Sequence, residues 1–311
     1  MASNLNRRVA FSLLVLIIVM LYGHNKAYSK CHFEAIFNFG DSNSDTGGFW
    51  AAFPAQSGPW GMTYFKKPAG RASDGRLIID FLAKSLGMPF LSPYLQSIGS
   101  DFRHGANFAT LASTVLLPNT SLFVSGISPF SLAIQLNQMK QFTVKVDESH
   151  SLDQPGMFSE NRYTFYIGQN DFTSNLASIG VDRVKQYLPQ VIGQIAGTIK
   201  EIYGIGGRTF LVLNLAPVGC YPAILTGMKY GIKACCGYGG RPYNFDQKLF
   251  CGNTKVIGNS SATAKACRDP HNYVSWDGIH ATEAANHHIF MAILDGSISY
   301  PPFTLINICP P

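Results

Sequence analysis

Charged side chains are scarce in this sequence. They make up 14% of its 311 residues, against roughly 25% in an average soluble protein. No run of Lys or Arg exceeds two residues, so the sequence does not favour binding to nucleic acid or to an anionic membrane surface. Glycine (30), tyrosine (14) and phenylalanine (22) fill the shortfall, and 46% of all residues are apolar. This composition excludes global disorder and predicts a large core under a loop-rich, neutral-polar surface.

A hydrophobic run of membrane-spanning length is also missing. The apolar run at 9–22 has 14 residues, below the roughly 20 that a spanning helix needs. It follows two arginines and precedes a small, polar stretch, which is the layout of a secretory signal peptide. We therefore predict a signal peptide over 1–28, and not the alternative of a short membrane anchor. Removing it lowers the formal net charge from +6 to +3, because it holds three basic residues and no acid.

Export has two consequences for the mature chain. We expect an extracellular protein of the apoplast or cell wall without a stable membrane anchor. Asn119 and Asn259 each stand in an N-x-S/T tripeptide, so both are predicted glycosylation sites if they lie in exposed loops.

Two common zinc patterns, C-x-x-C and H-E-x-x-H, are absent, so we predict neither a metal nor a cofactor. In an exported chain the cysteines mostly form disulfides. The sequence has 7 cysteines, and an odd number leaves one of them without a partner.

Strand and helix patterns alternate along the rest of the chain. Apolar strands are predicted at 35–39, 163–167 and 208–215, and helices at 77–86, 131–146, 189–203 and 282–296. This alternation predicts a mostly parallel α/β sheet. Residues 227–273 interrupt the alternation of strands and helices, and we predict an irregular, disulfide-held stretch there. No linker or repeat divides the chain, so we predict a single domain over 29–311.

A polar turn at 40–48 directly follows the first predicted strand. Ligand sites of open α/β sheets lie at the carboxyl ends of strands, so Ser42 is well placed for chemistry. A calcium loop is excluded because Thr46 stands where glycine is needed and Ala52 where glutamate is needed. A plain polar turn remains the alternative for this segment taken alone.

Asp277 lies three residues before His280. A nucleophilic serine needs a base, and the base needs a partner that fixes its tautomer. We therefore assign Ser42, His280 and Asp277 to these three roles. His287 and His288 lie on the following helix and are assigned to packing or to the solvent-facing surface.

Two further segments supply candidate oxyanion donors. Gly105 allows a backbone N–H to approach a substrate oxygen, and Asn170 carries a side-chain amide at a predicted strand end. Such donors stabilise the charge that develops during acyl transfer. The alternative for each is an ordinary turn residue.

Four segments, in this order, resemble the sequence blocks of the plant-type GDSL esterase/lipases, within the SGNH hydrolases: G-D-S-N-S-D-T-G-G (40–48), G-A-N-F-A (105–109), I-G-Q-N-D-F (167–172) and W-D-G-I-H (276–280). The resemblance also includes 70–76 and 216–220. It implies a flavodoxin-like α/β/α sandwich that hydrolyses carboxylic esters through an acyl-enzyme on Ser42, without a metal. The N–H of Ser42, the N–H of Gly105 and the amide of Asn170 would form the oxyanion hole. The expected partner is a small ester with a short acyl group such as acetyl, on a glycan or a plant metabolite.

The chain departs from the family pattern between Thr226 and Gly227. Roughly 60 residues, the size of a strand with flanking helices, are missing there, and a cysteine lost with them would explain the odd count. The loss leaves a second reading open. The chain would then be a catalytically impaired secreted glycoprotein with a binding or storage-like role, or a non-functional splice or gene-model variant.

Overall fold

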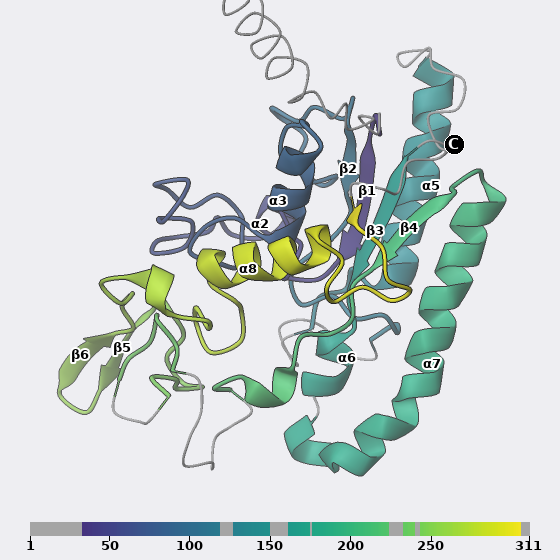
Figure 1. Ribbon diagram of the computed structural model, residues 1–311. Helices are drawn as coiled ribbons and strands as arrows, with labels where there is room; N and C mark the ends of the chain where they lie inside the picture. The colour runs from purple at the N-terminus through teal and green to yellow at the C-terminus, as the bar shows by residue number, and fades with distance from the viewer. Residues whose placement is uncertain are drawn as a thin grey trace, which may run out of the picture.

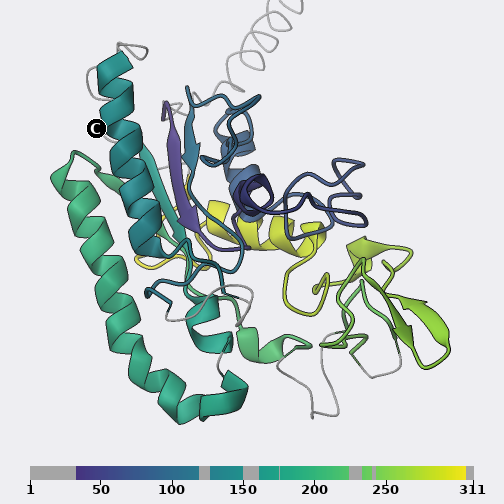
Figure 2. The ribbon, with the colours of Figure 1, turned by 180° about the vertical axis from the view of Figure 1, so that it is seen from behind.

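The computed structural model describes residues 33–118, 127–149, 161–174, 176–223, 233–239 and 243–305. The predicted signal peptide, Asn119 and the junction at 226–227 lie outside these ranges. The fold is a sheet of parallel strands between two layers of helices (Figures 1 and 2). The strands are β1 (Ile36–Gly40), β2 (Gly105–Asn107), β3 (Arg162–Tyr166) and β4 (Thr209–Val212), in the order β2-β1-β3-β4. The predicted α/β class with a mostly parallel sheet is confirmed.

Helices cover both faces of the sheet. They are α2 (Gly48–Ala52), α3 (Ile78–Ser85), α5 (Leu132–Ser149), α6 (Gln169–Thr173), α7 (Leu176–Gly204) and α8 (Glu283–Leu294), with 3-10 turns at Val218–Cys220 and Pro270–Asn272. Successive strand residues point to opposite faces. Phe37 and Phe39 therefore pack with α5 and α7, whereas Ile36 packs with α3 and α8.

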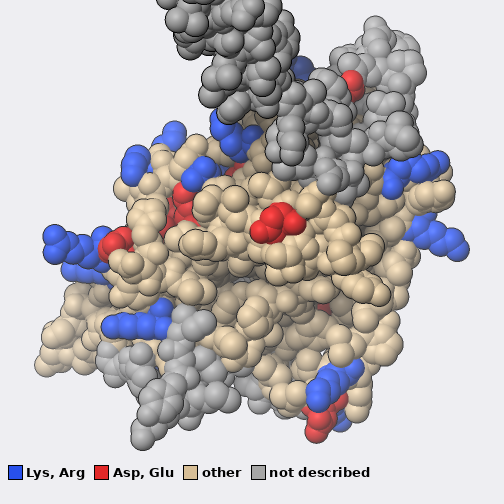
Figure 3. All heavy atoms as spheres, viewed as in Figure 1, with Lys and Arg blue, Asp and Glu red and all other residues tan. Residues whose placement is uncertain are grey.

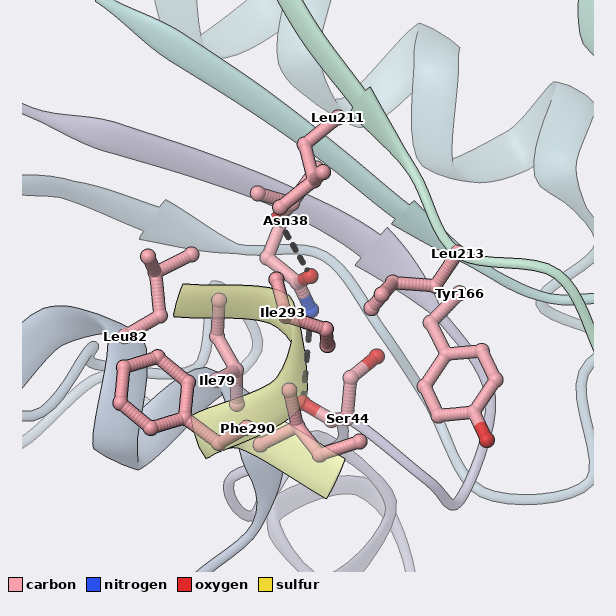
Figure 4. Close-up of a pocket in the computed structure, with 11 residues that line it drawn as sticks. Asn38, Ser44, Ile79, Leu82, Tyr166, Leu211, Leu213, Phe290 and Ile293 are labelled. Carbon is pink, nitrogen blue, oxygen red and sulfur yellow. Dashed lines mark hydrogen bonds between the residues drawn. The ribbon is translucent and has the colours of Figure 1, made fainter. Parts of the chain in front are cut away.

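Asn38 of β1 places a polar side chain within the layer between the sheet and the helices α3 and α8. Asn38 of β1 is buried there among Leu211, Phe290 and other apolar side chains (Figure 4). Its amide donates to the carbonyl oxygen of Ser44 (3.3 Å), and its oxygen accepts from the Thr164 hydroxyl (2.7 Å). A buried amide is tolerated when it is hydrogen-bonded, and here it ties the turn after β1 to the centre of the sheet.

The two edges of the sheet differ. Beside β2, Pro93 forms a bridge with Asn107, so a segment of chain covers that edge. β4 pairs with β3 on one side only, and its residues are half-buried or exposed, whereas β1 and β3 are fully buried. Among the described residues, β4 is therefore the open edge of the sheet.

The structure differs from the predicted elements in three places. The helix predicted to start at Pro189 is the second part of α7, which begins at Leu176 and contains a non-helical residue, Gly180. β2 was not predicted because it has only three residues. Residues 227–273 contain a hairpin of β5 (Thr254–Ile257) and β6 (Ser260–Thr263), whose polar, mostly exposed strands give no apolar pattern.

Disulfides hold the segment around this hairpin, as predicted. They join Cys235 to Cys267 and Cys236 to Cys251. The N–H groups of Cys235 and Cys236 donate to the carbonyls of Ser275 and Trp276 (3.0 and 2.6 Å), immediately before Asp277. In the described part of the chain Cys220 is a free, exposed thiol.

Candidate active site

Ser42 lies in a tightly fixed turn at the carboxyl end of β1, and only 3% of it is exposed. The Asp41 N–H donates to the carbonyl of Tyr166 at the end of the neighbouring strand (3.2 Å). The carboxylate of Asp45 accepts four backbone N–H bonds, from Gly47, Gly48, Phe49 and Leu111. A nucleophile in such a turn is held in place by the backbone around it and not by its own contacts.

Asp277 and His280 form a buried, hydrogen-bonded pair. The Nδ1 atom of His280 lies 2.7 Å from Oδ2 of Asp277, while Oδ1 accepts the backbone N–H groups of Ile279 (2.9 Å) and His280 (2.7 Å). Gly278 has a φ of 97°, and a Cβ there would lie 2.3 Å from the Phe245 ring. This glycine allows the loop to turn back on itself, so that one carboxylate orients the imidazole through Nδ1, while Nε2 makes no hydrogen bond to a described residue.

The electrostatics of the pair favour its charged form. Burial by itself would raise the pKa of Asp277, but the charge of His280 and three hydrogen bonds hold it below the usual value. Burial would lower the pKa of His280, but the carboxylates of Asp277 and, more weakly, Asp41 raise it. The neighbouring carboxylate thus stabilises the imidazolium that forms when a histidine accepts a proton from a nucleophile.

The Asp41 carboxylate links the Ser42 turn electrostatically to the Asp277–His280 loop. Asp41 precedes Ser42 directly, and it is close enough to His280 for each to shift the other's pKa. Burial raises the pKa of Asp41 to about 6. Tyr221 interacts electrostatically with both Asp41 and Asp277. The structure therefore brings the Ser42 turn and the Asp277–His280 loop to one location.

Asn170 also reaches this location. It lies in α6, which starts at the carboxyl end of β3, and its amide donates to the Ser113 carbonyl (2.8 Å). The preceding residue, Gln169, accepts a hydrogen bond from the Asn43 side chain (3.3 Å). These two bonds fix the start of α6 next to the turn of Ser42, and the role of Asn170 as an oxyanion donor stays a prediction.

The expectation for Gly105 was wrong. Gly105 pairs with Ile36, the first residue of β1, whereas Ser42 follows the last residue of that strand. Its N–H donates to the Phe102 carbonyl (3.1 Å) and is not available to a substrate. A Cβ at Gly105 would lie 1.9 Å from the Ile36 carbonyl oxygen. The glycine is thus required for close packing of β2 against β1.

A residue that we did not predict takes up a strained backbone conformation near Asn170. Ala112 is buried and has a φ of 64°, in the left-handed region that alanine rarely occupies. The next residue, Ser113, receives the Asn170 amide. Such strain is concentrated at functional sites. Nothing in the residue types indicated this conformation, because only glycine or asparagine would have marked a left-handed position.

The segment at 70–76 has a supporting role that the sequence did not reveal. Arg76 forms an ion pair with Glu283 (2.7 Å), and the Glu283 N–H donates to the Asp74 carboxylate (2.8 Å). These contacts fix the start of α8, directly after the loop of His280. Arg71 contacts the turn that holds Ser42, where its guanidinium donates to the Thr46 carbonyl (3.0 Å).

Replacing Asp80 by alanine is expected to destabilise the fold by about 3–5 kcal/mol, because it leaves Arg71 buried without a counter-charge. Asp80 accepts a bidentate pair of bonds from Arg71 (2.7 and 3.2 Å), and both side chains are buried. Urea denaturation measures the effect. Asp101→Ala breaks the exposed pair with Arg103, and is the matched control with little change expected. Equal losses for both variants would contradict this assignment.

The pH dependence of any hydrolysis here should follow His280. A general base must be neutral to accept a proton, so the rate falls as the pH drops through the pKa of His280. Because that pKa is raised above 6.5, the acid limb of a kcat/KM profile should have its midpoint above pH 6.5. A midpoint at or below that value would count against the assignment of His280.

Comparison with known proteins identifies the family. The model of the GDSL-like lipase/acylhydrolase family matches residues 36–293. A GDSL esterase/lipase of Arabidopsis thaliana is 74% identical over 383 residues and covers all of both chains. The chain belongs to the GDSL lipase/acylhydrolase family. Its class of chemistry is therefore carboxylic ester hydrolysis, and the predicted family membership is confirmed.

Other relatives of this GDSL chain agree. A second GDSL esterase/lipase of Arabidopsis thaliana is 39% identical over 361 residues, with 92% of this chain and 95% of the relative covered. A protein named Esterase from Hevea brasiliensis is 35% identical over 382 residues, with 99% and 96% covered.

The alignment with the first relative also reveals a deficit. It extends over 383 residues, 72 more than the 311 of this chain. Because both chains are covered from end to end, that relative has at least 72 residues that find no counterpart inside this chain. The internal shortening between Thr226 and Gly227 stays a prediction.

Proposed function

We propose that this chain is a secreted serine esterase that cleaves short-acyl carboxylic esters through an acyl-enzyme on Ser42. One observation carries the proposal: a buried Asp277–His280 pair lies beside the turn that holds Ser42. The acyl group would be acetyl or of similar size, on an acylated glycan or a plant metabolite. Trp60, whose ring centre is 6.2 Å from that of His280, offers an aromatic surface for the alcohol part of such a substrate.

The proposed reaction has two halves. In the first, Nε2 of His280 takes the proton from the Ser42 hydroxyl, and Oγ forms a bond to the acyl carbon. The tetrahedral intermediate collapses when the alcohol leaves with the proton held by His280. In the second half, water gives a proton to His280 and attacks the acyl-enzyme. The carboxylic acid leaves, and Ser42 recovers its proton.

The oxyanion of both intermediates needs donors that are already in position. We assign this role to the backbone N–H of Ser42 and to the side-chain amide of Asn170. We add the N–H of Ala112 in place of that of Gly105, because Ala112 lies in the segment that contacts Asn170 and its N–H donates to no other described residue. Each such donor contributes about 10²–10³ in rate.

Secretion rests on the signal-peptide layout of the sequence. No helix in the described part of the chain is long and apolar enough to cross a bilayer. Asn259 lies exposed in the turn between β5 and β6, and we propose that it carries an N-linked glycan. Digestion of the secreted protein with an endoglycosidase should reduce its mass, and should not do so in an Asn259→Gln, Asn119→Gln double variant.

Labelling with a fluorophosphonate probe tests the proposed activity. The probe reacts with a serine whose base and oxyanion donors are aligned, so we expect stoichiometric modification of Ser42, located by peptide mass spectrometry. Absence of labelling in the folded chain would overturn the proposal.

The same experiment addresses a second candidate function. The deficit of at least 72 residues relative to a 74% identical relative favours a secreted glycoprotein in which the catalytic residues are present but misaligned. A displacement of about 1 Å can lower a rate 10²-fold. A folded chain with an unlabelled Ser42 would support this second candidate.

A further inference from the structure

A continuous apolar surface surrounds the open edge of the sheet, and we call it the edge surface. It consists of β4, an exposed stripe on α7, and a groove between β4 and α8. Its exposed side chains are between 41% and 96% accessible: Val181, Leu188, Ile192, Tyr203, Val212, Ile298 and Tyr300. The face over α8, β4 and α7 carries few charged groups, most of them at its margins (Figure 3).

The stripe on α7 faces outward, beyond β4. Val181 and Leu188 are 7 residues apart before Pro189, and Ile192 and Tyr203 are 11 apart after it, so each pair lies on one side of its part of the helix. Glu201 binds Lys140 of α5, and it points roughly 200° away from Tyr203, two residues along the helix. α5 packs over β1, which is separated from the open edge strand β4 by β3. The stripe therefore points away from α5 and past the open edge.

The groove continues this surface on the other face of the sheet. It has a volume of about 730 Å³ and runs along residues 210–217, which include most of β4 and the segment after its carboxyl end. Ile289 and Ile293 of α8 form one wall, and Ile298, Tyr300 and Phe303 form its outer rim. The helix layers on both faces of the sheet thus expose apolar side chains beside β4.

An edge of this kind is unusual for a finished domain. Natural edge strands are protected by charges, proline or a covering segment, whereas β4 reads Thr-Phe-Leu-Val. Monomeric proteins rarely leave a large contiguous apolar patch exposed. The edge surface has the composition of a core face, and no strand among the described residues pairs with its outer side.

The deficit in the alignment is large enough to contain such a covering layer. A strand beside β4, a helix against the α7 stripe, a helix over the groove and their loops require roughly 45–65 residues. The 74% identical relative has at least 72 residues that this chain lacks, all of them internal. Taken as one segment, these residues are too many for a surface loop without structure of its own.

We propose that the edge surface is a docking site for a separate polypeptide equivalent to this segment, which adds a strand to β4 and packs helices on the stripe and in the groove. Main-chain hydrogen bonds to the open edge would give affinity, as in other cases of strand addition, and the apolar pockets would give specificity. The proposal does not depend on the catalytic assignment, since it concerns binding alone.

A binding experiment with the full chain tests this. The probe is the set of residues of the Arabidopsis thaliana relative that have no counterpart here, fused to a soluble carrier. We expect saturable 1:1 binding by calorimetry and a higher thermal midpoint of the complex. Val212→Lys on β4 and Ile192→Lys on the α7 stripe should each weaken binding at least about tenfold, because each buries a charge at the contact. Circular dichroism verifies that both variants are folded.

The hairpin provides a matched control. Val256 of β5 is as exposed as these side chains but belongs to the disulfide-held segment, so Val256→Lys should bind the probe like the unmodified chain. No binding at about 100 µM probe, or equal weakening by Val256→Lys, would overturn the proposal. It would also be overturned if the chain alone formed a dimer that Val212→Lys abolishes, because a second copy would then occupy the surface.

Discussion

Replacement of Ser42 by alanine is expected to lower kcat for p-nitrophenyl acetate by about 10⁴–10⁶-fold. Losses of this size follow removal of the nucleophile in other serine hydrolases, where the remaining rate comes from the oxyanion hole and substrate binding. Alanine removes only the hydroxyl, and the backbone bonds of Asp45 that shape the turn remain. KM should therefore change much less than kcat.

Ser44 offers a control within the same turn. It is buried, and its hydroxyl has no hydrogen-bond partner among the described residues. Ser44→Ala thus removes an equivalent group two residues away and should retain most of the activity. If Ser42→Ala were as active as the unmodified chain, Ser42 would not be the nucleophile. Loss of activity in both variants would show that activity depends on the conformation of the turn and not on the Ser42 hydroxyl.

Asp277→Asn is expected to lower kcat by about 10⁴-fold, as in serine proteases whose orienting aspartate is replaced by its amide. Asparagine preserves the shape of the loop but can donate a hydrogen bond to Nδ1, which favours the wrong tautomer of His280. The pKa of His280 should fall as well, because the Asp277 carboxylate is the group that raises it most. The acid limb of the residual activity should therefore move to lower pH.

A purely structural aspartate would not produce this shift of the pH profile. Asp295→Asn is the control, since Asp295 is a surface residue after α8 that accepts a hydrogen bond from Ser297. It should change neither kcat nor the position of the limb. An unchanged limb in Asp277→Asn, with kcat reduced, would mean that Asp277 supports the loop without acting on His280.

Stability around the pair depends on pH with opposite signs for its two members. The lowered pKa of Asp277 contributes stability above its ordinary value of 3.8, and this is lost as the pH falls through the folded-state pKa. The raised pKa of His280 contributes stability below 6.5, and this is lost as the pH rises through its folded-state value. Between these limits both contributions are present, and the pair is held as an ion pair.

The sequence was sufficient where chemistry and local spacing coincide. Asp277 and His280 lie three residues apart, so one loop brings them together, and Ser42 follows an apolar strand whose carboxyl end is the expected ligand edge. The first helical residues of α8 were also predictable, since Thr282 accepts the Ala285 N–H as an ordinary N-cap.

It was insufficient where the outcome depends on neighbours that are distant in the chain. Gly105 was assigned to the oxyanion hole because glycine permits close approach, but the close approach is that of β1 and not of a substrate. The left-handed Ala112 is imposed by its surroundings, against its own preference. The interior Pro189 of α7 shows the same limit, because tertiary packing keeps a helix that proline alone would end.

The contacts between the segment at 70–76 and α8 join parts of the chain that are 209 residues apart. Contacts of such long sequence separation carry a large loop-closure entropy cost. The loop of His280 therefore depends for its position on a segment that is synthesised early. Under the proposed function, a truncated or half-folded chain has no assembled site. Ester hydrolysis therefore also reports whether the segment at 70–76 has packed against α8.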